Sequence, residues 1–201
     1  MSDQTVIHTL EKRFAAFHQR YFKMQPEFCE RLVLEGQSPE VMVIACSDSR
    51  SDPAILFGAE PGELFVARTI ANWVPPYKHF ADPCSVQAAI AFAVLHLNVK
   101  HIMVLGHSHC AGVKTLTDDV NIAEPVLAWT KTITHETEQD YSLVHNVLVQ
   151  ARENLMTYPW VKERVASGAL SCHAWCFSLK SGHMEQYDPE RKIFSELEIV
   201  V

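Results

Sequence analysis

Three short runs of largely apolar, β-forming residues most strongly constrain the fold of this chain. They are residues 40–45 (EVMVIA), 63–67 (ELFVA) and 101–105 (HIMVL). Apolar side chains on both faces of a strand are typical of a parallel sheet that is covered on both sides. Residues 82–97, between the last two runs, begin with Asp-Pro and continue as an amphipathic helix. Strands that alternate with helices predict an α/β fold with a mostly parallel central sheet flanked by helices.

The first part of the chain has a different pattern. Between residues 3 and 35, apolar side chains recur at helical spacing of three and four, and Pro26 separates a second short helix. This pattern predicts an N-terminal helical arm over residues 1–36. No repeat or flexible linker divides the sequence, so we expect a single domain over residues 1–201.

The last part of the chain predicts further helices and a hairpin. After residue 110 the signals are mainly helical through residue 156. Residues 170–179 then form a strand-like run, residues 180–182 (KSG) a turn, and residues 183–187 a returning strand. The hairpin predicts an antiparallel C-terminal edge on the parallel sheet, which is a common addition to such sheets.

The charge balance argues against two classes of partner. The 17 Lys and Arg against 24 Asp and Glu give a net charge of −7, and no basic run is present. Nucleic acids and anionic membrane surfaces need concentrated Lys and Arg, so we expect neither as a partner. The longest apolar stretches are far shorter than the roughly 20 residues that span a bilayer, and the first residues lack the pattern of a signal peptide. We therefore expect a cytoplasmic protein.

Residues with metal-binding chemistry directly follow two of the predicted strands. Cys46 directly follows the first run, and His107 and Cys110 follow the run at 101–105. In open α/β sheets, ligands bind beyond the carboxyl ends of the strands, at the point where the strand order reverses. If these two strands are neighbours, the three side chains converge. Two thiolates and one imidazole suit Zn²⁺, and three protein ligands leave a fourth position open, as at catalytic zinc sites.

An acid–arginine pair stands beside the first of these cysteines. Asp48 lies two residues past Cys46, and Arg50 can hold its carboxylate through a bidentate pair. Such a pair beside a metal ligand would orient a water in the open position. Taken singly, a cysteine that ends a strand is more often an inert core residue, and an Asp–Arg pair is more often an exposed ion pair. The joint arrangement favours a metal site.

The two motifs, CSDSR at 46–50 and GHSHC at 106–110, resemble the zinc-site motifs of the β-class carbonic anhydrases. The resemblance covers most of the chain: it includes PGELFV at 61–66, RTIAN at 68–72, VPPY at 74–77, which is most similar to plant-type members, and HAW at 173–175. It implies Zn²⁺ as the cofactor, Cys46, His107 and Cys110 as its ligands, and Asp48 and Arg50 as a catalytic dyad.

The resemblance also implies a substrate pocket. Gln37, just before the first strand, matches the glutamine that orients the substrate in the family. Phe65 and Ile70 match the apolar wall of the family's carbon dioxide pocket. Phe92 stands where plant-type members carry a tyrosine, so the hydroxyl that would hold the glutamine side chain is missing. Without the resemblance, Gln37 would be interpreted as a loop residue and Phe65 as ordinary core.

Two further departures from the family bear on the site. Val43 stands where bicarbonate-regulated members usually carry a tryptophan, which favours an open site in which Asp48 stays paired with Arg50. Ala111 replaces the first glycine after the ligand cysteine, so the backbone there must adopt an angle that alanine tolerates.

The activity that the resemblance implies is the reversible hydration of carbon dioxide to bicarbonate and a proton, by a zinc-bound hydroxide that the Asp–Arg dyad orients. Two alternatives stay open: hydrolysis of carbonyl sulfide or carbon disulfide at the same zinc, and a non-catalytic zinc-binding module in which Asp48 is a permanent fourth ligand. A redox role for Cys172 and Cys176 is disfavoured, because residues four apart on a strand lie roughly 13 Å apart, too far for a disulfide.

The family also implies assembly as a homodimer or a multiple of dimers, with the pocket at the subunit interface. The predicted arm carries an apolar face that could pack on a partner or on its own domain. Its members are Val6, Leu10, Phe14, Phe17 and Tyr21.

The expected ligand set predicts how turnover depends on pH. Two thiolates cancel the charge of Zn²⁺, so a water on the metal is acidified less than it would be by three neutral imidazoles. We therefore expect the turnover rate to rise toward alkaline pH. The measurement is kcat for carbon dioxide hydration across the range, and a flat profile between about pH 6 and 9 would contradict the expectation.

Overall fold

The computed structural model describes residues 3–77, 84–117, 121–133 and 142–198. It consists of two compact units, residues 1–38 and 39–201, and we describe each by itself. The first contains α1 (Asp3–His18), a π-helical turn η1 (Gln19–Lys23) and α2 (Pro26–Glu35). The predicted helices are therefore present, and Pro26 is the first residue of the second, where its fixed φ suits the helix start. A single domain over the whole chain stays a prediction.

The apolar face of the first unit is mostly exposed. Tyr21 is buried, whereas Phe14 and Phe17 are exposed large apolar side chains, as are Val6 and Leu10. The rings of Phe17 and Tyr21 lie with their centroids 4.7 Å apart. Most of this face is thus exposed apolar surface on the first unit.

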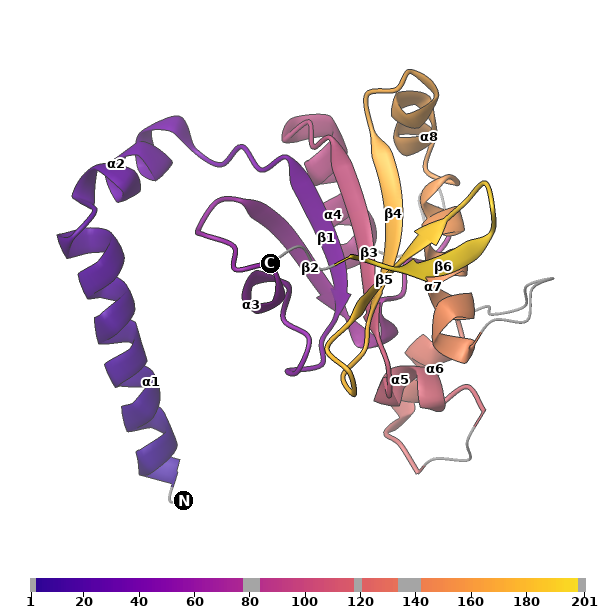
Figure 1. Ribbon diagram of the computed structural model, residues 1–201, viewed down its shortest axis with the longest axis horizontal. Helices are drawn as coiled ribbons and strands as arrows, with labels where there is room; N and C mark the ends of the chain where they lie inside the picture. Colours follow the sequence, from indigo (N-terminus) through magenta and orange to yellow (C-terminus); the bar gives the residue numbers. More distant parts are fainter. Residues whose placement is uncertain (1–2, 78–83, 118–120, 134–141, 199–201) are drawn as a thin grey trace. The chain divides into compact units, whose positions relative to one another are not determined.

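The second unit is built on a six-stranded sheet (Figure 1). In spatial order the strands are β2 (Leu64–Thr69), β1 (Val41–Cys46), β3 (His101–His107), β4 (Ser171–Phe177), β5 (Met184–Asp188) and β6 (Ile193–Glu196). The first four pair in parallel and the last two are antiparallel. The predicted parallel sheet with an antiparallel C-terminal edge is confirmed, and β6 is an additional edge strand that the sequence did not indicate.

The two strands that carry the metal-site motifs are neighbours. β1 pairs with β3 in parallel, with Ala45 opposite Leu105, and it pairs with β2 on its other side, with Cys46 opposite Thr69. The chain therefore leaves β1 toward one edge of the sheet and later returns on its other side. The strand order reverses at β1 and β3, which is where open α/β sheets bind their ligands.

Short helices connect the strands. They are α3 (Pro53–Leu56), the 3-10 turn η2 (Ile70–Asn72), α4 (Ser85–Ala91) with a π-helical end η3 (Phe92–His96), α5 (Ala111–Lys114), α6 (Glu124–Thr130), α7 (Leu143–Leu155) and α8 (Pro159–Ala166). The Asp82-Pro83 start expected for the helix before β3 lies outside the described residues. Over the part of the chain that the structure describes, we find no helix with the length and apolar character needed to cross a membrane.

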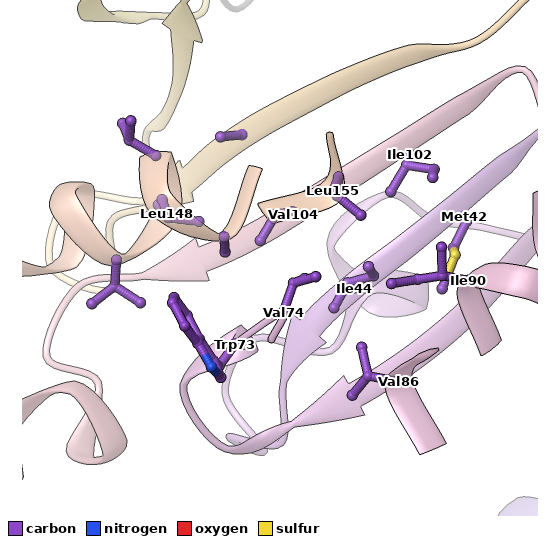
Figure 2. Packing of buried hydrophobic residues seen from close by; sticks show 14 of the residues in the cluster. Met42, Ile44, Trp73, Val74, Val86, Ile90, Ile102, Val104, Leu148 and Leu155 are labelled. Carbon is purple, nitrogen blue, oxygen red and sulfur yellow. The ribbon is translucent and has the colours of Figure 1, made fainter. Parts of the chain in front are cut away.

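The main core lies on one face of the sheet. Figure 2 shows apolar side chains of β1 and β3 meeting those of α4 and α7. The labelled members from these elements are Met42, Ile44, Ile102, Val104, Val86, Ile90, Leu148 and Leu155, all at most 2% exposed. Such close packing fixes the positions of the strands, so the residues that directly follow β1 and β3 start from a rigid base.

Candidate metal centre

Cys46, His107 and Cys110 are brought together at the carboxyl ends of β1 and β3. One ligand atom from each lies within 4.8 Å of the other two, and all three residues are buried. The sulfur atoms of Cys46 and Cys110 are 3.7 Å apart. Cys110 precedes the first residue of α5 and has an extended backbone. The convergence expected from the sequence is thus present, while the ligand role of each residue stays a prediction.

The imidazole of His107 is oriented for a cation. Its Nδ1 lies 3.0 Å from the carbonyl oxygen of Ser108, which can only accept a hydrogen bond, so Nδ1 carries the hydrogen. The other nitrogen, Nε2, then presents a lone pair. Nε2 is fully buried and has no hydrogen-bond partner among the described residues. A buried acceptor without a partner costs free energy, and a metal ion at this point would satisfy it.

The two thiols of the centre are close enough for one to donate a hydrogen bond to the other. A hydrogen bond from Cys110 lowers the pKa of the Cys46 thiol, although burial opposes the shift. The thiolate of Cys46 in turn raises the pKa of Cys110, and burial raises it further. A divalent cation between the two sulfurs would favour ionisation of both, because thiolates are the form that binds metals. The donor set therefore fits Zn²⁺.

Asp48 and Arg50 form the bidentate pair expected from their spacing. Arg50 Nε donates to Oδ1 of Asp48 at 2.9 Å and Nη2 donates to Oδ2 at 2.7 Å. The backbone N–H of Arg50 also donates to Oδ1, at 2.9 Å. These hydrogen bonds from Arg50 hold the pKa of the Asp48 carboxyl far below its ordinary value, so Asp48 is ionised at neutral pH. Oδ2 of Asp48 lies 3.7 Å from Nε2 of His107, which places the carboxylate at the edge of the candidate centre.

Arg68 fixes the loop that carries this pair, a role that sequence reasoning missed. Its Nε donates to the carbonyl oxygen of Cys46 at 3.0 Å and its Nη2 donates to that of Asp48 at 2.7 Å. It also forms an ion pair with Asp52, whose carboxylate accepts from the N–H of Ala54 at the start of α3. Strand register brings Arg68 to this loop, because Arg68 is opposite Ala45 in the β1–β2 pairing, one residue before Cys46.

The expected pocket residues lie in different parts of the structure. Phe65 of β2 and Phe92 at the start of η3 stack with ring centroids 5.8 Å apart. Ile70, in η2, is 36% exposed, and its carbonyl oxygen accepts a hydrogen bond from Trp129 Nε1 at 2.9 Å. Gln37 belongs to the first unit. The role of all four in substrate binding stays a prediction.

Ala111 begins α5 and is not among the residues with positive φ, so the backbone there suits alanine. The next residue, Gly112, has no room for a side chain. A Cβ on it would lie 2.7 Å from Cγ2 of Ile70 and 3.1 Å from the backbone nitrogen of Ala71. Real Cβ contacts essentially never reach the first distance, so a substitution must displace α5 or η2.

We expect Gly112→Ala to lower the free energy of unfolding by about 1–3 kcal/mol. The added methyl group pushes against Ile70 and the Ala71 backbone, directly after Cys110. Urea unfolding measures the effect. The control is Gly112→Ala combined with Ile70→Ala, which removes one of the two clashes and should lose less than the sum of the single changes. Strict additivity would contradict the clash.

Comparisons with known proteins point to one family. Residues 41–184 match the model of a protein family described as "Carbonic anhydrase". The chain is 33% identical to a carbonic anhydrase of Synechocystis over 92% of its own length and 71% of that protein. It is 32% identical to the chloroplastic β carbonic anhydrase 5 of Arabidopsis thaliana, covering 90% of this chain and 65% of that protein, just under two thirds.

Solved structures show the same fold. The structure of the β-carbonic anhydrase CcaA superposes with a TM-score of 0.81 at 29% identity, over 97% of this chain and 93% of that one. A structure from a study of two tetrameric β-carbonic anhydrases of Sordaria macrospora superposes with a TM-score of 0.77 at 28% identity, over 90% of this chain and 96% of that one.

Proposed function

The chain belongs to the β-class carbonic anhydrase family, and from this membership we propose that it catalyses the reversible hydration of carbon dioxide to bicarbonate and a proton. The observation that carries the proposal is the convergence of two buried thiols and the unpartnered Nε2 of His107 beside an ionised aspartate. A centre with three protein ligands and a neighbouring hydrogen-bond acceptor can hold and orient a water.

Cys46, His107 and Cys110 would hold Zn²⁺ in this proposal. When bound, zinc supplies a Lewis acid that lowers the pKa of a water it binds and so makes a nucleophile available near neutral pH. The hydrogen bond between Nδ1 of His107 and the Ser108 carbonyl fixes the ring so that Nε2 faces the centre. The three ligands are buried, which excludes bulk water from the metal side of the site.

Asp48 would orient the nucleophile. Its carboxylate is an acceptor only, because the pairing with Arg50 keeps it ionised. A carboxylate oxygen next to the centre can accept the hydrogen of the attacking oxygen and so leave a lone pair directed at the carbon of carbon dioxide. The formed Asp48–Arg50 pair supports the open type of site, in which the aspartate stays off the metal.

Phe65, Ile70 and Phe92 would form an apolar wall for the substrate. Carbon dioxide has no hydrogen-bond donor and no net charge, so stacked rings such as those of Phe65 and Phe92 suit it better than polar groups do. Gln37 would orient the substrate by donating a hydrogen bond to its oxygen. Phe92 has no hydroxyl with which to hold that amide.

The assembly we propose is a homodimer or a multiple of dimers. The support within the chain is the exposed apolar face of α1, which includes Phe14 and Phe17; exposed apolar surface of this kind commonly marks an interface. The Sordaria structures are described as tetrameric. A monomer in sedimentation equilibrium at micromolar concentration would contradict this proposal. A cytoplasmic location also stays a prediction.

The deciding experiment is carbon dioxide hydration by the zinc-loaded protein, measured with and without a chelator. We expect hydration that the chelator abolishes and added Zn²⁺ restores. Faster hydrolysis of carbonyl sulfide or carbon disulfide by the same preparation would favour the related hydrolase. No turnover on any of these substrates, with zinc present at full stoichiometry, would favour a non-catalytic zinc module.

A further inference from the structure

A second group of metal-binding side chains lies in the 39–201 unit and shares no residue with the first. His145 of α7, Cys176 of β4 and Glu185 of β5 each offer one ligand atom, and these atoms all lie within 4.8 Å of one another. Among the described residues, the Cys46, His107 and Cys110 group is the only other one with this arrangement. The mechanism proposed above uses none of the three.

The fold brings these three residues together through strand register and helix packing. Cys176 is directly opposite Glu185 in the antiparallel pairing of β4 with β5, and directly opposed residues point to the same face of a sheet. Cys176 belongs to the core cluster that α7 also contributes to. His145 lies in the first turn of α7, where its backbone N–H donates to the capping Ser142. The three ligand atoms are therefore held by three different elements.

Two contacts hold the imidazole of His145 in place. Its Nε2 lies 3.1 Å from Oε2 of Glu185. Its ring stacks on the ring of Phe194, with centroids 3.9 Å apart and planes inclined by 11°. His145 and Glu185 have side chains that are 18% and 36% exposed, so the pair is reachable from solvent, while Cys176 is buried at 3%. The group thus has a fixed imidazole, a buried thiol and a carboxylate with freedom to adjust.

The spacing suits one metal ion. Bonds from zinc to nitrogen, sulfur and oxygen are about 2.0–2.3 Å, so two ligands on one tetrahedral zinc lie about 3.4–3.8 Å apart. The distances within the group reach at most 4.8 Å, and rotation of the partly exposed Glu185 side chain can close the difference. A pocket of about 370 Å³ lies against all three residues and gives room for a water as a further ligand; it is also lined by Ser108, His109, Lys114 and Ser178.

We propose that His145, Cys176 and Glu185 form a second zinc-binding site. The donor types decide the metal: magnesium and calcium take oxygen ligands, whereas imidazole, thiolate and carboxylate together are ligands that Zn²⁺ accepts. The thiol gives up its proton to the solvent when it binds the ion, and the imidazole binds through the ring nitrogen that carries no hydrogen, with the hydrogen on the other one. A zinc here would link α7 to the β4–β5 hairpin, so its role is to stabilise the fold.

The test is a zinc count on the full chain dialysed against micromolar ZnCl₂. We expect two zinc ions per chain in the wild type, and one in Cys176→Ser and in His145→Gln. Two matched controls keep both ions. Cys172→Ser changes another thiol on the same face of β4, and His183→Gln breaks a His–Glu pair, with Glu196 at 2.7 Å, that is not part of either metal-binding group.

Two further readouts separate this site from loose surface binding. Added Cd²⁺ should produce a second increment of the ultraviolet thiolate-to-cadmium band in the wild type, and this increment should be missing in Cys176→Ser. Added Zn²⁺ should raise the Tm of the wild type further than that of His145→Gln. A zinc content that neither Cys176→Ser nor His145→Gln lowers by one ion per chain relative to the wild type would overturn the proposal. If the first centre fails to bind zinc, the wild type holds one ion and both variants hold none, so failure of the two sites is distinguishable. Neither result depends on carbon dioxide hydration, so the activity proposed above is tested separately.

Discussion

Replacement of Cys46 by alanine is expected to abolish carbon dioxide hydration together with zinc binding at the first centre. Cys46 ends β1 and supplies one of two sulfurs that lie 3.7 Å apart in a buried site. Without it, a cation would have two protein ligands, His107 and Cys110, and lose the charge of one thiolate. Affinity for zinc at a site of this kind depends on the full ligand set. We therefore expect the zinc affinity of the first centre to fall by at least about 100-fold, and its zinc to be lost on dialysis.

The measurement combines metal content with turnover after dialysis against a weak chelator. The control is Cys29→Ser, since Cys29 lies in the first unit and its thiol donates to the carbonyl oxygen of Tyr21 at 3.3 Å, a bond that a serine hydroxyl can also make. We expect this variant to keep full zinc content and turnover. Hydration at the wild-type rate by Cys46→Ala would show that the metal is not held as proposed.

The sequence anticipated that Cys46, His107 and Cys110 could lie together because two of them are tied to strand ends. Cys46 and His107 end buried strands, and parallel strands that neighbour each other bring their ends to one edge. Local sequence located the strand ends, since the apolar runs marked the strands and the polar residues marked where they end. The adjacency of β1 and β3 was only a condition of the prediction, and the structure shows that it is met.

Contacts between distant segments were not predictable in this way. The hydrogen bonds from Arg68 to the carbonyl oxygens of Cys46 and Asp48 depend on the exact register of β2 against β1. The His145, Cys176 and Glu185 group depends on the β4–β5 register and on the rotation of α7. A shift of one residue in either register would turn these side chains to the opposite face, and the sequence pattern fixes element type more firmly than register.

Short edge elements were also missed. β6 has four residues and a mostly exposed pattern, which gives little hydrophobic periodicity to recognise. α8 begins at Pro159 and buries only Val161 among its residues, so its apolar stripe is weak as well. Both elements are stabilised by tertiary packing more than by their own sequence.

Asp48→Asn is the substitution that separates the catalytic interpretation from a structural zinc module. Asparagine keeps the size of aspartate and one carbonyl oxygen, but it places an NH₂ group where one carboxylate oxygen stood and loses the charge. The bidentate pair with Arg50 cannot form with an amide, because Arg50 donates to both oxygens. We expect kcat to fall by about 100-fold or more, while zinc content at the first centre stays at the wild-type level.

Arg50→Lys gives the matched comparison for this pair. A lysine keeps the positive charge but cannot make the two parallel hydrogen bonds that fix the carboxylate plane. We therefore expect a smaller fall in kcat than for Asp48→Asn, with zinc again retained, because Asp48 remains ionised but is free to rotate. Loss of zinc in Asp48→Asn would contradict the catalytic interpretation. It would show that Asp48 is itself a ligand of the metal. No position would then be left for a water, and the centre would be structural.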